Sequence, residues 1–228
     1  MKISLIILTL NEISGLKQIM QQIPEEAVEE VLAIDGGSTD GSVEYLKAVG
    51  IQVFNQENPG RGEAFKVAFD VSKGDALIFF SPDGNESPSD IPKFRPLLEK
   101  GAAIVIATRM VVGARNEEDD SVLPLRKWVN QCFTLVSNIV WNRNSYVTDA
   151  INGFRAITRD AWNQLNPDES GYTIEYQTTI RAFKNSLSIM EFPTFEGDRI
   201  GDKKGSPSFS TGLAFVQLFF KEIVSKRH

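Results

Sequence analysis

ISLIILTLNE, at residues 3–12, is a run of apolar residues that ends abruptly in polar ones. The apolar part, Ile3–Leu8, is rich in isoleucine and leucine, which is typical of a strand buried on both faces of a parallel sheet. Apolar residues then recur at helical spacing from Leu16 to Ile23 and stop at Pro24. A buried strand followed by a short helix predicts the first unit of an α/β fold.

The same alternation continues through the first half of the chain. We expect further strands at residues 31–34, 51–54, 76–80 and 102–107, and helices at residues 40–50, 62–71 and 91–98. Short connections between such units predict an open, mainly parallel sheet that is flanked by helices, with a Rossmann-like N-terminal half. Ligands of these sheets bind at the carboxyl ends of the strands. The polar residues that follow each strand are therefore the first candidates for a functional site.

The second half is less regular. It predicts helices at residues 124–141, 174–183 and 213–224, and short strands at residues 153–157 and 187–192. Between the halves lies a polar loop, residues 110–123, whose acidic run Glu117–Asp120 we interpret as a solvated loop tip. Neither an internal repeat nor a linker interrupts the chain, so we expect residues 1–228 to form a single domain.

Composition excludes several classes of function. The 228 residues carry 24 basic and 30 acidic side chains, a net charge of −6, so we expect no nucleic-acid partner. The single histidine, His228, stands at the end of the chain, which excludes an internal Ser-His-Asp triad and zinc sites built on several histidines. Cys132 is the only cysteine, so no intramolecular disulfide forms. Any metal must be held by oxygen ligands.

Hydropathy gives an expectation about location. The apolar run at residues 1–10 is too short for a signal peptide, and the longest uncharged stretches are shorter than a membrane span. We therefore expect a cytoplasmic protein, with peripheral contact at the cytoplasmic face of a membrane left open. The last predicted helix, residues 213–224, has an apolar side that suits either a membrane surface or packing against the domain or a twin subunit, and we favour packing.

The segment Asp35–Ser42 reads DGGSTDGS and joins the second predicted strand to a helix. Its glycines let the backbone approach a ligand closely, and Asp35 at the strand tip can accept hydrogen bonds from a base or ribose. A plain turn, with Asp40 as the N-cap of the helix, is the alternative interpretation. The segment matches neither a Walker loop nor a G-x-G-x-x-G fingerprint.

An ordered set of motifs accompanies this segment. The set comprises TLNE (9–12), NPGRGEA (58–64), GDALIFFSPD (74–83), ATR (107–109), Asp149 before NGFR (152–155), Glu175, and Arg199-x-Gly201-x-x-Lys204. In this order the motifs resemble the inverting nucleotide-sugar glycosyltransferases of family two, which have a GT-A fold. They are most similar to the dolichol-phosphate mannosyltransferase-like branch.

The resemblance implies a function. The chain would transfer a hexose from a GDP- or UDP-sugar to a polyprenyl phosphate, with residues 1–109 binding the nucleotide-sugar and residues 110–228 the acceptor. A sugar or other hydroxyl acceptor is the close alternative. A homodimer is also open. A different class of function, non-catalytic binding of a nucleotide-sugar, is suggested by a departure from the family's D-x-D motif, in which Ser81 stands at the first acidic position.

That motif implies a cation. By resemblance Asp83 is the ligand of Mg²⁺ or Mn²⁺, and Asn85 adds a carbonyl oxygen. Such a cation would stabilise the departing diphosphate. Because Ser81 supplies no carboxylate, the site is expected to be weaker than in the family, and metal-free neutralisation of the diphosphate by arginine and lysine is the alternative.

The resemblance also assigns the remaining candidate residues. The nucleotide-binding residues would be Leu8, Thr9, Glu12, Asp35 and Gly60; the phosphate-binding residues would be Arg126, Arg199 and Lys204; the catalytic residues would be Asp83, Asp149 and Arg109. Arginine suits phosphate because its planar fork binds two oxygens at once. Asp149 would orient the acceptor or act as a base in hydroxyl-acceptor members; a plain ion pair with Arg155 is the alternative.

Overall fold

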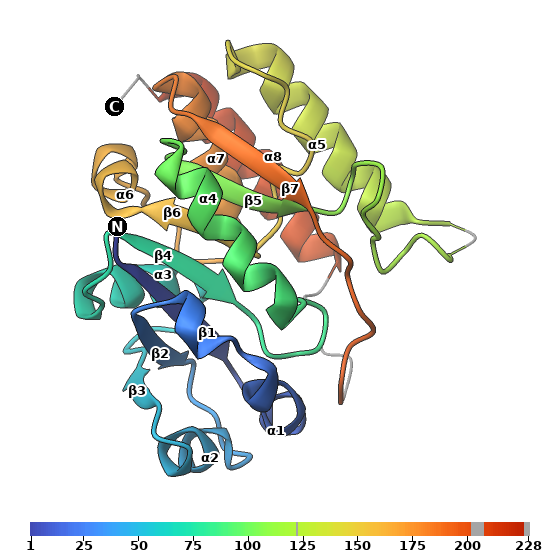
Figure 1. Ribbon diagram of the computed structural model, residues 1–228. Helices are drawn as coiled ribbons and strands as arrows, with labels where there is room; N and C mark the ends of the chain where they lie inside the picture. Colours follow the sequence, from blue (N-terminus) through green and yellow to red (C-terminus); the bar gives the residue numbers. More distant parts are fainter. Residues whose placement is uncertain (122, 202–207, 226–228) are drawn as a thin grey trace.

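The computed structural model describes residues 1–121, 123–201 and 208–225. These residues form a seven-stranded sheet in the order β3-β2-β1-β4-β6-β5-β7. The strands are β1 (Ile3–Thr9), β2 (Glu30–Asp35), β3 (Gln52–Asn55), β4 (Ala76–Phe80), β5 (Ile104–Thr108), β6 (Arg155–Thr158) and β7 (Ile189–Pro193). Helices cover the sheet on both sides (Figure 1). The predicted α/β fold with a mainly parallel sheet is confirmed.

The position of β6 differs from a simple alternating order. It pairs antiparallel with both β4 and β5, and the other pairings are parallel. A strand from the second half of the chain therefore lies between two strands of the first half. Hydrophobic periodicity identifies a strand but not its neighbours, which is why the sequence did not indicate this insertion.

The helices follow the sequence pattern closely. They are α1 (Ile13–Ile19), α2 (Ser42–Ala48), α3 (Arg61–Val71), α4 (Phe94–Glu99), α5 (Leu125–Trp141), α6 (Arg159–Leu165), α7 (Ile174–Lys184) and α8 (Ser208–Val224), with 3₁₀ turns at Met20–Gln22, Glu25–Ala27 and Pro88–Lys93. The predicted helix at 91–98 is part 3₁₀ turn and part α4. Pro92 lies inside this 3₁₀ turn and donates no backbone hydrogen bond. No helix was predicted from the sequence at the position of α6.

Two hydrophobic layers hold the sheet between the helices. Ile3, Leu5 and Ile7 of β1 point to one face, where α1, α2 and α4 pack. Ile6 and Leu8 point to the opposite face, where α3, α6 and α7 pack. This alternation follows from the two-residue period of a strand. Because both faces are covered, the open edge at the carboxyl ends of the strands is left for ligands.

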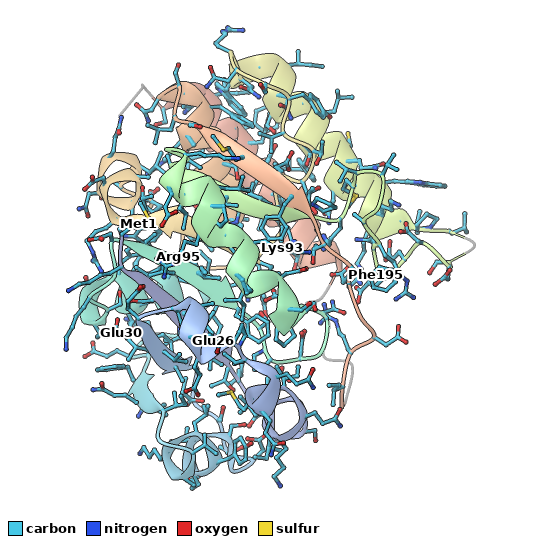
Figure 2. All side chains as sticks on the ribbon, viewed as in Figure 1. Met1, Glu26, Glu30, Lys93, Arg95 and Phe195 are labelled. Carbon is cyan, nitrogen blue, oxygen red and sulfur yellow. The ribbon has the colours of Figure 1, made fainter. Side chains whose placement is uncertain are left out.

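Two further contacts fix the surroundings of β1. Arg95 of α4 donates to the Met1 carbonyl over 3.1 Å and pairs with Glu29 at 2.8 Å, so α4 is fastened to the start of β1 (Figure 2). Asp40 accepts hydrogen bonds from the backbone of Ile13 and of Ser42, both at 3.0 Å. The N-cap of α2 is Gly41, one residue after the predicted Asp40.

Helix α5 has an inverted pattern. Its buried residues, Thr134, Ser137 and Asn138, are polar, whereas large apolar residues on the other side are exposed. These exposed residues are Leu125, Trp128, Val129, Leu135, Ile139 and Val140. The polar residues are satisfied by local bonds; Asn138, for example, donates to the carbonyls of Thr134 and Val147. An apolar helix face turned to solvent marks a surface that meets another apolar body.

Helix α8 lies beside α5 (Figure 1), in contact through Phe133 and Phe215, whose rings are 5.5 Å apart. Phe215 and Leu218 are buried among residues of α7, so the expected packing of this helix against the domain is observed. The opposite side of α8 exposes a second apolar stripe: Leu213, Val216, Phe220, Ile223 and Val224. Within the described ranges, no helix has the length and apolar character needed to cross a membrane.

Candidate active site

A cavity of about 660 Å³ lies at the carboxyl ends of the strands. Nine of the predicted site residues line it: Leu8, Thr9, Glu12, Gly60, Asp83, Asn85, Arg109, Arg126 and Arg199. Asp35 lies between two lining residues, Ile34 and Gly36. Asp149 is buried behind Arg109, and Lys204 falls outside the described residues. The structure thus gathers residues from distant motifs into one cavity.

The ends of β1 and β2 form the first wall. Thr9 and Asp35 are partners in the parallel register, and both are buried. One oxygen of Asp35 accepts hydrogen bonds from the backbone of Gly37 and Ser38, at 2.8 and 2.9 Å. Among the described residues, neither its other oxygen nor the Thr9 hydroxyl has a hydrogen-bond partner. Buried polar atoms without partners are costly, so this pair is suited to a ligand that supplies hydrogen bonds.

The start of α3 forms the second wall. Gly60 has φ +129°, and a Cβ there would lie 2.2 Å from the Ser170 carbonyl oxygen, so only glycine allows this approach. The next residue, Arg61, pairs with the buried Glu175 of α7 and reaches Ser81 at 3.4 Å. Glycine at 60 therefore lets α3 approach the loop before α7 and brings Arg61 into the cavity.

The loop after β4 carries the oxygen donors. Asp83 accepts a hydrogen bond from the Asn85 backbone, and its second oxygen lies 3.6 Å from Arg199. The Asn85 amide nitrogen donates to Glu117 and Glu196, which fixes the orientation of the side chain, while its oxygen is buried without a partner. Both side chains line the cavity.

Glu86 lies beside these donors and accepts a 2.7 Å hydrogen bond from the backbone of Ser81. Burial raises the pKa of Glu86 to about 8; Arg61 opposes that shift and Asp83 adds to it. Burial therefore favours the protonated, uncharged form of Glu86 in this loop.

Asp83 and Asn85 are the residues of this loop that were predicted to hold a cation. Within the part of the chain that the structure describes, no three acidic, histidine or cysteine side chains gather into a metal centre. The Asp83 carboxylate and the unpartnered Asn85 oxygen nevertheless fit a hard cation, which takes oxygen ligands. Two protein ligands are few, so such a cation would also need the oxygens of a bound diphosphate.

Arg109, which follows β5, is held by two carboxylates. Its guanidinium forms a two-pronged pair with Asp149, at 2.8 and 3.0 Å, and contacts Glu196 at 3.2 Å. Burial alone would lower the pKa of Arg109, but Asp149 and Glu196 outweigh burial and keep it raised. The predicted alternative pairing of Asp149 with Arg155 is wrong: Arg155 is buried and donates instead to backbone carbonyls and threonine hydroxyls.

The loop after Arg109 also reaches the cavity. A backbone bridge between Arg115 and Phe195 ties this loop to the segment after β7. Glu117 contacts Arg126, Arg199 and the Asn85 amide. The interpretation of the acidic run as a solvated tip is therefore wrong for Glu117 and Glu118, which pair with basic residues and line the cavity.

Apolar side chains form the remaining wall. Leu125, Val129 and Phe133 of α5 and Phe215 of α8 line the cavity together with its charged residues. Leu125 and Val129 also belong to the exposed stripe of α5. The charged interior is thus continuous with the apolar surface of the two helices.

Comparison with known proteins places this arrangement in a family. Residues 4–165 match the model of glycosyl transferase family 2. The chain belongs to this family. It is an enzyme of the glycosyltransferase class, as the motif order suggested.

The chain is also similar to two curated proteins and, in fold, to one solved structure. The glycosyltransferase AglJ of Haloferax volcanii is 24% identical over 214 residues, covering 92% of this chain and 69% of that protein. The UDP-N-acetylglucosamine–dolichyl-phosphate N-acetylglucosaminyltransferase of Methanococcus voltae is 25% identical over 217 residues, covering 84% of each. Glucosyl-3-phosphoglycerate synthase of Mycobacterium tuberculosis, solved with Mn²⁺, UDP-glucose and phosphoglyceric acid, has a TM-score of 0.75 at 21% identity, covering 97% of this chain and 79% of that one. The last likeness is one of fold.

Among the cavity residues that the site prediction missed are Arg61, Glu86, Glu117 and Glu196. Arg61 stands inside the NPGRGEA motif and Glu86 lies three residues after the GDALIFFSPD motif, so their position was a usable signal. Glu117 was visible only as part of an acidic run. Glu196 has no sequence signal, because it enters the cavity through the pairing of β7 with β5.

Proposed function

We propose that the protein transfers a hexose from a GDP- or UDP-sugar to a polyprenyl phosphate, with inversion at the anomeric carbon. The observation that carries this proposal is that one cavity joins three surfaces: the unpartnered Thr9 hydroxyl at the ends of β1 and β2, arginines, and an apolar wall from α5 and α8. A nucleoside, phosphate groups and a hydrocarbon chain match these surfaces in turn. The dolichyl-phosphate substrate named for the Methanococcus voltae relative supports this acceptor class.

We propose roles that follow from the contacts. Thr9 and Asp35 accept hydrogen bonds from the nucleoside, with Leu8, Glu12 and Gly60 around it. Asp83 and Asn85 hold Mg²⁺ or Mn²⁺, which stabilises the charge of the departing diphosphate when bound. Arg109 is fixed by Asp149 and Glu196, so it presents its charge with little reorganisation, which is the property of an effective electrostatic catalyst.

The state of Asp149 distinguishes between acceptors. A hydroxyl acceptor requires a base, whereas a phosphate acceptor is already anionic. Both oxygens of Asp149 accept hydrogen bonds from Arg109, so Asp149 is a positioning residue for that arginine. This favours the phosphate acceptor. A lipid-linked acceptor also places the reaction at the cytoplasmic face of a membrane, with the exposed stripes of α5 and α8 toward the lipid.

The proposal is tested by measuring sugar transfer with the full chain. A panel of GDP- and UDP-sugars is incubated with Mn²⁺ or Mg²⁺ and with a ten-carbon prenyl phosphate, the corresponding prenol, or phosphoglycerate. We expect transfer to the prenyl phosphate alone. Asp83→Ala should lower kcat by roughly 10³-fold, because electrostatic stabilisation of the leaving group is lost.

The matched control is Asp70→Ala on the exposed side of α3, which should leave the rate unchanged. Transfer to phosphoglycerate or prenol instead of the prenyl phosphate would overturn the acceptor assignment. Nucleotide-sugar binding without turnover on any acceptor would support the non-catalytic alternative.

A further inference from the structure

Glu117 fills the space between two arginines. One of its carboxylate oxygens pairs with Arg126, in the first turn of α5, and the other lies 3.3 Å from Arg199, which follows β7. The same second oxygen accepts a 3.2 Å hydrogen bond from the Asn85 amide. We call this space, bounded by Arg126, Arg199 and Asn85, the anion position.

The donors around the anion position match a phosphate group as well as a carboxylate. Guanidinium groups bind the oxygens of either anion by charge-assisted hydrogen bonds. A phosphate monoester offers three oxygens and a charge of about −1.5 to −2 at neutral pH, against −1 for a glutamate. A phosphate monoester is therefore the better partner for two converging arginines.

The surrounding contacts allow the Glu117 side chain to leave while the rest of the loop stays. The Glu117 backbone N–H donates to Glu196 at 2.9 Å, a bond that does not involve its side chain. Arg126 keeps its separate 2.9 Å contact with Glu118, and Asn85 keeps its 3.0 Å bond to Glu196. Loss of the Glu117 carboxylate would thus vacate the anion position without releasing its walls.

We propose that Glu117 occupies the position of the acceptor's phosphate group in the free protein and that this phosphate displaces it. Glu117 is thereby a specificity-determining residue. An acceptor that carries a phosphate monoester replaces the lost ion pairs, whereas a neutral hydroxyl acceptor cannot, because it supplies neither arginine with the negative charge that Glu117 provided. The inference rests on the proposed function for the identity of the acceptor and deepens it.

The test measures binding by calorimetry at constant ionic strength, with the full chain and without sugar transfer. The probes are a ten-carbon prenyl monophosphate, the corresponding neutral prenol, and UDP as the donor-type diphosphate. Glu117→Gln keeps the size of the side chain and removes the competing charge. We expect it to bind the prenyl monophosphate roughly three- to tenfold more tightly than the wild type, the range of a modest ion pair, with UDP affinity unchanged.

Asp120→Asn is the matched control. It removes the same charge three residues along the same loop, and Asp120 is exposed, pairs with Arg115 and does not line the cavity. We expect its affinity for the prenyl monophosphate to stay within about twofold of the wild type, since it leaves the anion position filled by Glu117. Equal tightening in both variants would reveal a general charge effect and overturn the proposal.

Other results also decide the matter. Unchanged or weaker binding of the prenyl monophosphate by Glu117→Gln overturns the proposal. Tighter binding of UDP alone assigns the anion position to the donor and overturns the acceptor assignment. Thermal unfolding of each variant checks that it is folded. If Glu117→Gln does not fold, Glu117→Asp serves instead: it keeps the charge but shortens the reach, and the same direction of change is expected.

The binding assay separates this inference from the proposed reaction. Tighter prenyl monophosphate binding by Glu117→Gln, together with no sugar transfer by the wild type, would support the displacement and overturn the proposed reaction. Sugar transfer by the wild type, together with no effect of Glu117→Gln on prenyl monophosphate binding, would support the proposed reaction and overturn the displacement.

Discussion

The two ends of the cavity satisfy their polar groups in opposite ways. At the ends of β1 and β2, the Thr9 hydroxyl and one Asp35 oxygen are buried without partners in the part of the chain that the structure describes. Around β5 and β7, the charged groups are paired: Arg109 lies between Asp149 and Glu196, and Glu117 between two arginines. The first end is incomplete without a ligand, and the second end is complete without one.

This difference separates stability from binding. A group that is held unpartnered for a ligand lowers the stability of the free protein, whereas a group in a paired network raises it. Ligand binding at the first end adds hydrogen bonds, and at the second end it exchanges ion pairs. Substitutions at the two ends should therefore change the free energy of unfolding in opposite directions.

The largest effect is expected from Asp149→Asn. The variant leaves the buried Arg109 guanidinium with a weaker partner, and breaking a buried pair costs about 3–5 kcal/mol. We expect a loss near the lower end of that range, about 3 kcal/mol, because the amide oxygen still accepts a hydrogen bond. Urea unfolding measures it, with the exposed Asp70→Asn as control. A loss below about 1 kcal/mol would show that the paired end contributes little to stability.

The second prediction concerns Glu222→Gln in α8, the helix beside the paired end of the cavity. Glu222 of α8 is fully buried and pairs with Arg181 and Lys184 of α7, at 2.9 and 2.6 Å. Burial would raise the pKa of Glu222, but the hydrogen bonds from Lys184 and Arg181 outweigh burial and lower it. Glu222→Gln should cost about 2–3 kcal/mol near pH 7.

The loss of unfolding free energy in Glu222→Gln should depend on pH in a definite direction. A carboxyl group whose pKa is lower in the folded state stabilises the protein above its unfolded pKa, and this contribution is lost as the pH falls through the folded value. The stability difference between wild type and Glu222→Gln should be constant above about pH 5 and shrink below about pH 4. Unfolding curves across this range measure it. A difference that grows on acidification would contradict the assignment of Glu222 as an ionised partner.

The smallest effect, and the one of opposite sign, is expected from Thr9→Val. The substitution keeps the shape of the side chain and removes a buried hydroxyl without a partner. We expect the free protein to gain about 1 kcal/mol, and nucleotide affinity to fall roughly tenfold because a hydrogen bond to the ligand is lost. Unfolding and calorimetry measure the two quantities. A loss of stability would remove the contrast between the two ends.

The incomplete end of the site was largely predictable from the sequence, and the paired end was not. Thr9 and Asp35 are the last residues of β1 and β2, Asp83 lies three residues after β4, and the strand-end rule places such residues at one edge. The partners of Arg109 depend on side-chain packing over long separations in the chain. Asp149 was expected to orient the acceptor or pair with Arg155, yet it pairs with Arg109, and Glu196 arrives from β7.

The fold shows the same limit. Each strand of the sheet was recognisable from its apolar run, and α5 was bounded correctly by Pro124 and Trp141. The neighbours of β6 were not recognisable, because a strand of four residues carries no information on which strands it joins. The ion pairs of the acidic run were not predictable for a related reason. Charge alone does not reveal whether a glutamate faces water or an arginine.

The insertion of β6 has a consequence for how the protein is made. A ribosome releases the N-terminal half first, and domains usually fold as they emerge. Here β4 has no partner on one side, and β5 has no link to it, until residues 155–158 have left the exit tunnel. The nascent chain therefore carries an open sheet edge for much of its synthesis, the kind of surface that chaperones bind.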